Sequence, residues 1–415
     1  MARLGRSFAF LWSSTGLSNL ADGLLKVGAP LLAVTMTRSP TLVSLVGAAA
    51  TLPWLLLALH AGAIADRADR RRIMVRANLI RAALLAAVTA LAALGLLNLW
   101  LLLAAVLLAG VCEVFADLSA QSILPMAVSR DDLTRANGRV STAQMIGNDF
   151  VGAPVSGLLV VALPAALFGG PAVLYAAAGL LLLGMRGAYR LPAPAARRPM
   201  RADIGEALRY LWGHRVLRSL AVTAGLLNLA NAGFFAVFVL WAVGDGSRIG
   251  LEPGEYGLMT TAFAVGAIFG SLLAARAAAL FGELGTLVGN WLISSLLLLV
   301  PVVVPSPWAL YPTAVLWGLV GAAGNVLVIS ARQRLIPVEL LGRVNSAYRL
   351  IGMGGMPLGA ALGGVVAEFA GLTAALVGAV GVCLAAVGLV WRVLSDQFSG
   401  PLTSEPTLSD ISGSH

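Results

Sequence analysis

The sequence predicts an all-α integral membrane protein with twelve transmembrane helices, arranged as two six-helix, pseudo-symmetric halves. Three observations lead to this fold class: hydrophobic content, recurring long apolar stretches and an internal repeat. Of the 415 residues, 59% are hydrophobic and only 11% are charged, whereas about a quarter of the residues in soluble domains are charged. Apolar stretches of roughly 18 residues or more, long enough to cross a bilayer as a helix, recur along the whole chain.

The apolar stretches are joined by short polar turns. Turn-forming residues such as Asn98 and the Pro305–Pro307 run separate neighbouring stretches, because Pro and Asn favour turns over helix interiors. A helix suits each stretch because it satisfies its own backbone hydrogen bonds in lipid. The twelve spans are expected near 8–34, 41–63, 73–97, 99–119, 141–163, 171–189, 217–242, 256–277, 284–304, 308–330, 346–368 and 372–394.

One long polar connection divides the spans six and six. It covers residues 190–216 and contains six arginines. The predicted organisation is an N-terminal six-helix half (1–189), a cytoplasmic central loop (190–216), a C-terminal six-helix half (217–394) and a cytoplasmic tail (395–415). The tail is rich in Ser and Pro, a composition that favours disorder.

Arginines gather in the loops on one side of the predicted bundle. They are Arg3, Arg6, the run from Arg67 to Arg76, Arg130, Arg135, Arg139, the central-loop arginines, Arg332, Arg334 and Arg343. The opposite loops contain only Arg38 and Arg248. By the positive-inside rule, the arginine-rich side and both termini are cytoplasmic. The net charge of +9 is therefore a topology signal, and we expect no nucleic-acid partner.

The composition also indicates a source and a location. Ala, Arg, Gly and Leu dominate, and Lys26 is the single lysine, which is typical of a GC-rich bacterial genome. We therefore expect a multi-pass protein of the bacterial cytoplasmic (inner) membrane. Its two cysteines, Cys112 and Cys383, both lie in apolar runs, where Cys packs as a small hydrophobe.

The chain repeats itself at about half its length. The run Gln121–Pro125 after span four matches Gln333–Pro337 after span ten, and Gly138-Arg139-Val140 recurs as Gly342-Arg343-Val344. Pro154 in span five has its counterpart in Pro357 of span eleven. Parallel repeats of this kind are typical of transporters whose two halves rock about a central site.

A charged loop between spans two and three connects this plan to a known family. The stretch GAIADRADRRR, residues 62–72, resembles the major facilitator superfamily signature G-x-L-A-D-R-x-G-R-R, with Asp69 where the family usually has Gly. The matching residues are Gly62, Ala65, Asp66, Arg67, Arg70 and Arg71. The segments QSILP…ANGRV and GRVNS…MPLGAALGG resemble the exporters that include siderophore and macrolide efflux proteins.

The resemblance implies a conformational latch between the halves on the cytoplasmic side. Gly62 would allow a close approach of helices, and Asp66 would dock against span eleven. Arg67 and Arg71 belong to the same basic loop. Arg70 would pair with an acid near the cytoplasmic end of span four, a role for which Asp117 is placed. The alternative is a basic loop that only sets topology.

Charged residues inside the spans are the strongest candidates for function, because an ionisable group within a membrane is costly and functional by default. Asp22 and Lys26 stand four residues apart on one face of span one, and Glu113 lies deep in span four. Asp149 lies in span five. A carboxyl group in a low-dielectric cavity takes up a proton more readily than one in water, and a nearby cation opposes this.

We therefore expect Asp22 to bind a proton or a cationic substrate, with Lys26 tuning it. Glu113 and Asp149 are further coupling candidates. The alternative for Asp22 and Lys26 is a structural ion pair that never titrates. For Glu113 and Asp149 the alternative is likewise a structural role.

Further candidates come from the helices that line the central cavity in the superfamily, spans one, four, seven and ten. They are Asn19, Asn228, Asn231 and Phe235. The asparagines could instead bond a neighbouring helix, and Phe235 could face lipid. Span five contains Ala153-Pro154-Val155-Ser156-Gly157, which resembles the exporters' G-P-x-x-G signature. With Pro357, Pro154 and Gly157 form a predicted helix-packing motif.

No motif of an enzyme, a nucleotide-binding loop or a metal site is visible, so we predict neither catalysis nor a metal or cofactor. An ion gradient is then the expected energy source. The sequence predicts a proton-coupled exporter of hydrophobic or amphipathic small molecules that works by alternating access, as a monomer in the lipid bilayer. Two alternatives stay open: a proton-independent carrier of lysophospholipid-like lipids, and a transporter-shaped sensor that binds without transport.

Overall fold

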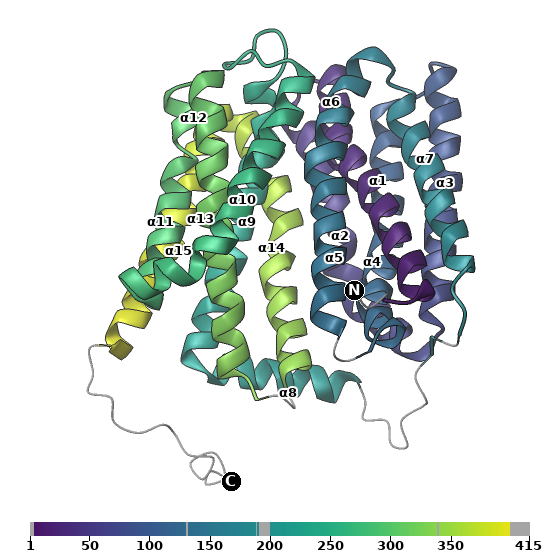
Figure 1. Cartoon of the computed structure of the whole chain (residues 1–415). Coiled ribbons are helices and arrows are strands. Elements are labelled where there is room, and N and C mark those ends of the chain that lie inside the picture. Colours follow the sequence, from purple (N-terminus) through teal and green to yellow (C-terminus); the bar gives the residue numbers. More distant parts are fainter. Residues whose placement is uncertain (1–3, 130–131, 188, 191–199, 338–339, 399–415) are drawn as a thin grey trace.

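The computed structural model describes residues 4–129, 132–187, 189–190, 200–337 and 340–398. The first part of the chain forms an N-terminal bundle, seen in purple to teal in Figure 1. Its elements are α1 (Arg6–Met36), α2 (Pro40–Arg67), α3 (Arg70–Ala93), α4 (Leu99–Ala127), α5 (Leu133–Met145), the π-helix η2 (Ile146–Gly152), α6 (Ala153–Ala162) and α7 (Ala166–Leu183).

The second part forms a C-terminal bundle beside the first (Figure 1). Its elements are α9 (Arg215–Ala242), α10 (Pro253–Phe281), α11 (Glu283–Leu297), α12 (Val300–Val303), α13 (Pro307–Leu335), α14 (Leu341–Ala370) and α15 (Leu372–Phe398). Twelve helical segments of the described chain are long and apolar enough to span a membrane. This confirms the predicted number of spans.

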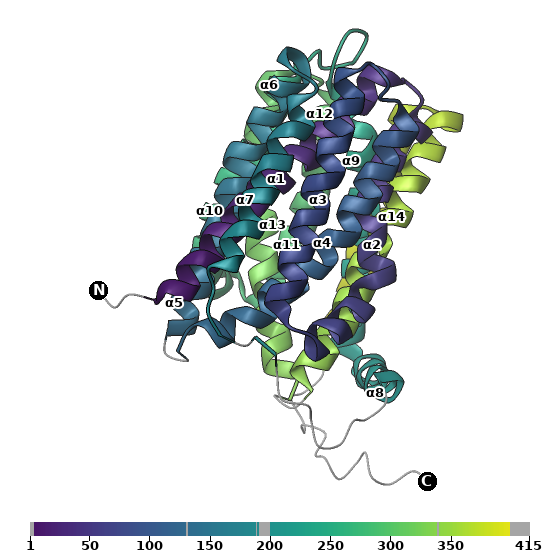
Figure 2. The same cartoon turned by 90° about the vertical axis from the view of Figure 1, so that its right-hand side faces the viewer.

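The connection between the bundles contains an additional helix, α8 (Met200–Gly213), which the sequence analysis did not anticipate. It lies across one end of the molecule (Figures 1 and 2). We call this end, where α1 begins and α15 finishes, the α8 end. The opposite end, which contains the turns at 37–39, 243–252 and 304–306, is called the far end.

Several observed helices extend beyond the predicted spans. Helix α4 continues eight residues past the expected end at 119, and α15 continues to Phe398, whereas the tail was expected to begin at 395. The predicted spans mark only the apolar stretches. A helix can continue past its apolar stretch into water at the membrane surface, and it ends where its hydrogen bonds can no longer be satisfied. The predicted disordered tail otherwise lies outside the described residues.

Local capping chemistry explains where several helices begin. The side chain of Ser39 accepts a hydrogen bond from the Leu42 amide, and Asp69 does the same for the Arg72 amide at the start of α3. Asn98 caps α4 through the Leu101 amide. Such side chains satisfy backbone N–H groups that have no partner within the helix.

Span five is the exception to regular α-helix. Between α5 and α6, residues Ile146–Gly152 form the π-helix η2. A π-helix adds a residue to the turn and is frequent at functional sites. Here its glycines pack against α1: an added Cβ on Gly147 would lie 2.9 Å from the Leu20 amide nitrogen, and one on Gly152 would lie 2.8 Å from the Cα of Gly23.

The two bundles meet along two seams, α2 against α14 and α6 against α10. In the second seam, an added Cβ on Gly157 would collide with Pro253, while one on Gly257 would lie 2.9 Å from the Cα of Pro154. The predicted packing residues Pro154 and Gly157 therefore lie where the bundles touch. Pro357 is buried inside α14, the helix of the other seam.

Helix α14 also packs closely on α9 within the C-terminal bundle. A Cβ on Gly359 would overlap the Leu229 carbonyl oxygen, and one on Gly233 would lie 2.8 Å from the Gly359 carbonyl oxygen. Small residues of this kind allow helices to approach when lipid provides no hydrophobic drive for association.

We predict that Gly359→Val destabilises the protein by about 1–3 kcal/mol, because overpacking forces α9 and α14 apart. Thermal unfolding in detergent, followed by fluorescence-detected size exclusion, measures the effect. Gly378→Val at an exposed position of α15 is the matched control, because a Cβ there meets no atom within 4 Å. Equal unfolding temperatures for the two variants would contradict the packing argument.

Candidate functional site

The interior of the N-terminal bundle is organised around one buried guanidinium group. Arg81 of α3 is only 2% exposed and forms an ion pair with Asp22 of α1. The ring of Tyr175 of α7 lies 3.9 Å from the Arg81 Cζ, and the Tyr175 hydroxyl donates to Asp22 Oδ1 at 2.6 Å. Figure 2 shows α3, α4 and α7 side by side on this bundle. Helices α1, α3 and α7 thus each contribute a side chain to this ion pair and its hydrogen bond.

A second carboxylate approaches the same guanidinium from α4. Glu113 Oε2 lies 3.9 Å from Arg81 Nη2, and the Glu113 side chain is 33% exposed, compared with 14% for Asp22. Asp117, one helical turn further along α4, is within electrostatic range of Asp22 and Arg81. One cation therefore serves a group of acids, of which Glu113 is more accessible than Asp22.

The alternative in which Asp22 and Lys26 form a structural ion pair is wrong. The structure pairs Asp22 with Arg81 and Tyr175, and Lys26 is exposed. The charge of Lys26 instead acts on Glu113, Asp117 and Asp149. Residues four apart on a helix are neighbours, but a buried tertiary partner with a planar, hydrogen-bonding fork binds a carboxylate better than a flexible ammonium group.

Asp149 and Asn19 belong to the contact between α1 and η2. Asn19 is buried, and its side-chain oxygen accepts a hydrogen bond from the Asn148 side chain at 3.0 Å. The backbone carbonyl of Asp149 accepts a hydrogen bond from the Thr261 hydroxyl of α10 at 2.8 Å. Asn19 thus joins two elements of one bundle, and the π-helix reaches the other bundle.

The remaining cavity candidates lie in the C-terminal bundle. The amide nitrogen of Asn228 faces Gly352 of α14, and the side-chain oxygen of Asn231 is buried with no hydrogen-bond partner among the described residues. Phe235 belongs to a half-buried aromatic group on three helices: its ring centroid lies 5.0 Å from that of Trp317, which lies 4.8 Å from that of Phe263.

The structure changes the interpretation of the predicted latch. An added Cβ on Gly62 would meet no atom within 4 Å, so this glycine does not mediate a close approach. The buried guanidinium of Arg70 lies 3.7 Å from Met126 Sδ, which is about 13 Å along α4 from Asp117. Asp117 therefore belongs to the Arg81 group, and its predicted pairing with Arg70 is wrong.

Three further latch residues were predicted. Arg71 donates to the Leu183 carbonyl oxygen of α7 at 3.0 Å, a contact within the N-terminal bundle. Arg67 is exposed at the end of α2. The side chain of Asp66 lies outside the described residues.

Contacts between the bundles at the far end pair charged side chains with helix ends. Glu368 of α14 accepts hydrogen bonds from the Ser39 hydroxyl at 2.7 Å and from the Thr41 amide at 3.2 Å, at the start of α2. Arg38 donates to the Val243 carbonyl oxygen at 3.4 Å, where α9 ends. An anion at a helix start and a cation at a helix end both match the helix dipole. We call these the far-end contacts.

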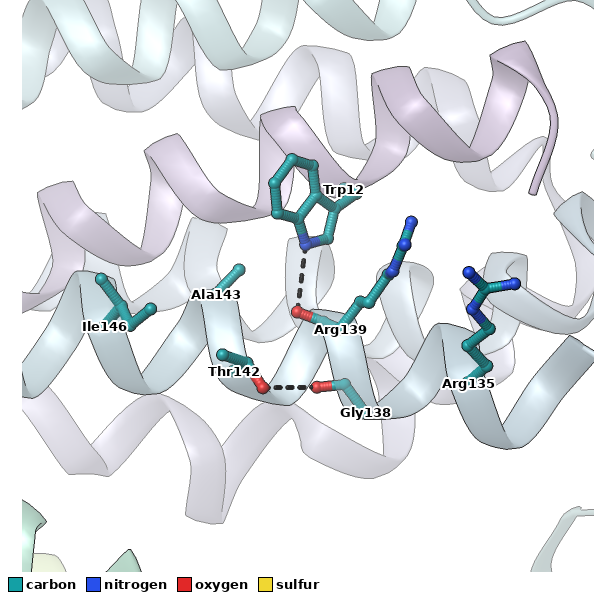
Figure 3. Close-up of a pocket in the computed structure, with 7 residues that line it drawn as sticks. All are labelled: Trp12, Arg135, Gly138, Arg139, Thr142, Ala143 and Ile146. Atoms are coloured by element: carbon teal, nitrogen blue, oxygen red, sulfur yellow. Dashed lines mark hydrogen bonds between the residues drawn. The ribbon is translucent and has the colours of Figure 1, made fainter. Parts of the chain in front are cut away.

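A surface pocket lies between α1 and α5, away from the Arg81 group (Figure 3). Trp12 donates its indole N–H to the Arg139 carbonyl oxygen at 3.0 Å, and the Thr142 hydroxyl donates to the Gly138 carbonyl oxygen at 2.8 Å. None of the predicted coupling, latch or cavity residues lines this pocket. It therefore plays no part in the candidate site.

Arg81 and Tyr175 were not predicted from the sequence as site residues. A signal for Arg81 was present, because it is a charged residue inside the third predicted span, and the rule that identified Asp22 applies to it equally. Tyr175 gives no such signal, because a tyrosine in an apolar span is common at membrane interfaces and in cores.

We predict that Arg81→Gln destabilises the protein by about 3–5 kcal/mol, because it leaves the Asp22 carboxylate buried without its cation. The Asp22→Asn, Arg81→Gln double variant should be more stable than Arg81→Gln alone, since both charges are then absent. Thermal unfolding of the set in detergent gives the double-mutant cycle. Arg334→Gln, which breaks the exposed pair with Glu283, is the control and should cost less than about 1 kcal/mol. Additive losses would contradict a direct pairing.

We predict that Glu368→Ala shifts the population toward molecules with an open far end by roughly five-fold, the effect of about 1 kcal/mol. Spin labels at exposed Leu96 and Asp245, in a cysteine-free background, report the distance between the bundles at that end. Glu283→Ala on α11 is the control, because its partner Arg334 lies in the same bundle. An unchanged distance distribution in Glu368→Ala would show that this carboxylate does not hold the far end.

Comparisons with known proteins agree with this architecture. The family model described as transmembrane secretion effector matches residues 4–400. The multidrug efflux pump Tap of Mycolicibacterium fortuitum is 27% identical over 88% of this chain and 89% of its own length. The enterobactin exporter EntS of Shigella boydii serotype 4 (strain Sb227) is 28% identical over 86% of this chain and 84% of its own length.

Solved structures show the same fold at low sequence identity. The nucleoside transporter NupG has a TM-score of 0.74 at 12% identity, covering 94% of this chain and 99% of NupG. A bacterial homologue of the iron transporter ferroportin, in an inward-facing state, has a TM-score of 0.72 at 17% identity, covering 96% and 100%. The prediction that the chain is a transporter rather than an enzyme is confirmed by the family and its relatives. The chain belongs to the transmembrane secretion effector family of major facilitator superfamily transporters.

Proposed function

We propose that this protein is a proton-coupled exporter, an antiporter that moves hydrophobic or amphipathic small molecules by alternating access. The observation that carries the proposal is the group formed by Asp22, Arg81, Glu113 and Tyr175 inside the membrane-spanning bundle. Charges at this depth are costly and functional by default. The two relatives, a multidrug efflux pump and an enterobactin exporter, support the direction of transport.

The arrangement of charges suits proton exchange. The single positive charge of Arg81 compensates the charge of one carboxylate. Asp22 is that carboxylate, and the Tyr175 hydroxyl stabilises it by donating a hydrogen bond. Glu113 is more exposed and lies 3.9 Å from the same guanidinium, so it is the carboxyl group that exchanges a proton with water. A proton bound to Glu113 removes one negative charge from the group. When Glu113 releases this proton, its carboxylate again competes with Asp22 for Arg81.

Lys26 and Asp149 complete the coupling region. Lys26 is exposed and its charge acts on Glu113, Asp117 and Asp149. In this proposal Lys26 offsets the acids while they are ionised, and Asp149 is an auxiliary acid next to the seam with α10. Asn228, Asn231 and Phe235 remain candidates for the cargo cavity in the C-terminal bundle.

The proposal includes a location and an orientation. We place the protein as a monomer in the bacterial cytoplasmic membrane, with the α8 end and both termini in the cytoplasm, because the arginine-rich loops lie at that end. The halves 1–189 and 217–394 then rock about the central region, with 190–216 as the cytoplasmic connection. The far-end contacts join the bundles at the side away from the cytoplasm, and in this proposal they break when cargo leaves on that side.

We predict that exchange of protons for cargo depends on both carboxylates. Purified protein is reconstituted in proteoliposomes with a pH-sensitive dye inside and exposed to lipophilic cations, macrolides, siderophores and lysophospholipids. Asp22→Asn and Glu113→Gln should reduce cargo-driven proton movement at least roughly ten-fold, a loss of about 1.4 kcal/mol in transition-state stabilisation or more. Glu283→Gln, an exposed carboxylate of the C-terminal bundle, is the control and should behave like the unmodified protein.

The same experiment distinguishes the proposal from the lipid carrier. Transport of lysophospholipid with no proton signal, unchanged in both carboxylate variants, would overturn the antiporter and make the Asp22–Arg81 pair a structural one. Binding without transport of any compound would favour the sensor.

A further inference from the structure

Two arginines of the C-terminal bundle have no carboxylate within ion-pair distance among the described residues. Arg332 of α13 stacks on Tyr348 of α14, with its Cζ 4.1 Å from the ring centroid, and its Nε is buried without a hydrogen-bond partner in the part of the chain that the structure describes. Arg349, one residue beyond Tyr348, donates only to the neutral Gln121 side chain, at 3.4 Å. The two guanidinium groups are close enough for their charges to act on each other.

Two other arginines at the same end of this bundle form ion pairs with carboxylates. Arg334 forms a two-pronged pair with Glu283, with N–O distances of 2.8 and 2.5 Å. Arg343 lies 3.1 Å from Glu206 of α8. A basic side chain needed only for topology is expected in a loop or close to a helix end. Arg349, however, lies about 12 Å along α14 from its start.

The position of Arg349 puts it between the bundles. Gln121 belongs to α4 of the N-terminal bundle, and the ring of Trp54 of α2 lies 5.8 Å from the Arg349 Cζ. Asp117 of α4 is within electrostatic range. Arg349 is exposed, and Trp54 is half-buried. The Arg349 guanidinium therefore lies where the two bundles meet, beside the ring of Trp54.

We propose that Arg332 and Arg349 form an anion-binding subsite, which recognises a carboxylate, sulfonate or phosphate group on an amphipathic cargo. Two neighbouring cations repel each other, and an anion between them removes that repulsion. The planar guanidinium fork binds such oxyanions through paired hydrogen bonds. The half-buried ring of Trp54 beside Arg349 offers an aromatic face to the apolar part of the cargo. The proposal names the substrate class of the exporter proposed above and rests on that function for its role in transport.

A pair of dyes with one ring system and opposite charges tests the subsite. Fluorescein is an anion and rhodamine 6G a cation at pH 8, and both are xanthenes. Binding to purified protein in detergent is measured by fluorescence anisotropy, so the result does not depend on transport or on protons. We predict that the Arg332→Gln, Arg349→Gln double variant binds fluorescein at least roughly ten-fold more weakly, which corresponds to about 1.4 kcal/mol. Its affinity for rhodamine 6G should be unchanged or higher.

Matched controls separate the subsite from general charge and from misfolding. The Arg334→Gln, Arg343→Gln variant removes the same charge from the same end and should bind fluorescein normally. The Arg332→Lys, Arg349→Lys variant keeps the charge but loses the fork, and should give intermediate affinity. Equal weakening in the Arg334 and Arg343 control, or no weakening in the Arg332 and Arg349 variant, would overturn the proposal. If the unmodified protein binds rhodamine 6G but neither fluorescein nor an anionic lysophospholipid, the proposal is also overturned and the exporter is left intact.

A lipid arm identifies the source of the anion. If fluorescent lysophosphatidylglycerol binds in an arginine-dependent way and fluorescein does not, the subsite stands and its cargo is a lipid. If fluorescein binding depends on the arginines but no cargo drives protons in proteoliposomes, the subsite stands and the proton-coupled function fails.

Discussion

The constraint on which the structure depends is that a charge inside a bilayer needs a partner inside the protein. Arg81 is almost fully buried in α3, and its compensation requires Asp22 from α1, Glu113 from α4 and Tyr175 from α7 to reach one point. This requirement sets the rotation and depth of those helices, which hydropathy alone leaves free, because every face of such a helix is apolar. The candidate coupling site and the packing of the N-terminal bundle are therefore one feature.

The two bundles have different electrostatic roles. The acids of the membrane interior lie in the N-terminal bundle, whereas the two arginines of the proposed anion subsite, Arg332 and Arg349, lie in the C-terminal bundle. At the far end the bundles exchange charges: Glu368 reaches the start of α2, and Arg38 reaches the carbonyl that ends α9. Charges at helix ends of this kind lie near water and are screened. The contacts that they make therefore break and form at a lower free-energy cost than those of the buried Arg81 group. A reversible seam at the surface and a persistent group inside suit alternating access.

The number of spans could be predicted from the sequence because each apolar stretch is long enough to be recognised alone. Tertiary features could not. The i, i+4 spacing suggested Lys26 as the partner of Asp22, but Arg81, 59 positions away, takes that place, and no spacing rule reaches so far. The π-helix η2 depends on Gly23 of α1 meeting Asn148 and Gly152, and Gly62 was assigned to close packing by resemblance although its surroundings are open. Charges inside spans were the reliable signal for the site, and they would have identified Arg81 as well.

A continuous set of contacts joins the buried charges to the seam between the bundles. Asn19 lies one turn before Asp22 on α1 and bonds Asn148 of η2, and the next residue, Asp149, accepts the Thr261 hydroxyl of α10 through its carbonyl. The glycine contacts leave no slack, because a Cβ on Gly23 would lie 2.6 Å from the Asn148 carbonyl oxygen. Movement of α1 that follows a change of charge in the Arg81 group must therefore be taken up by η2 or passed to α10. A π-helix is frequent at functional sites, and discrete rearrangement rather than gradual bending is how packed interfaces respond.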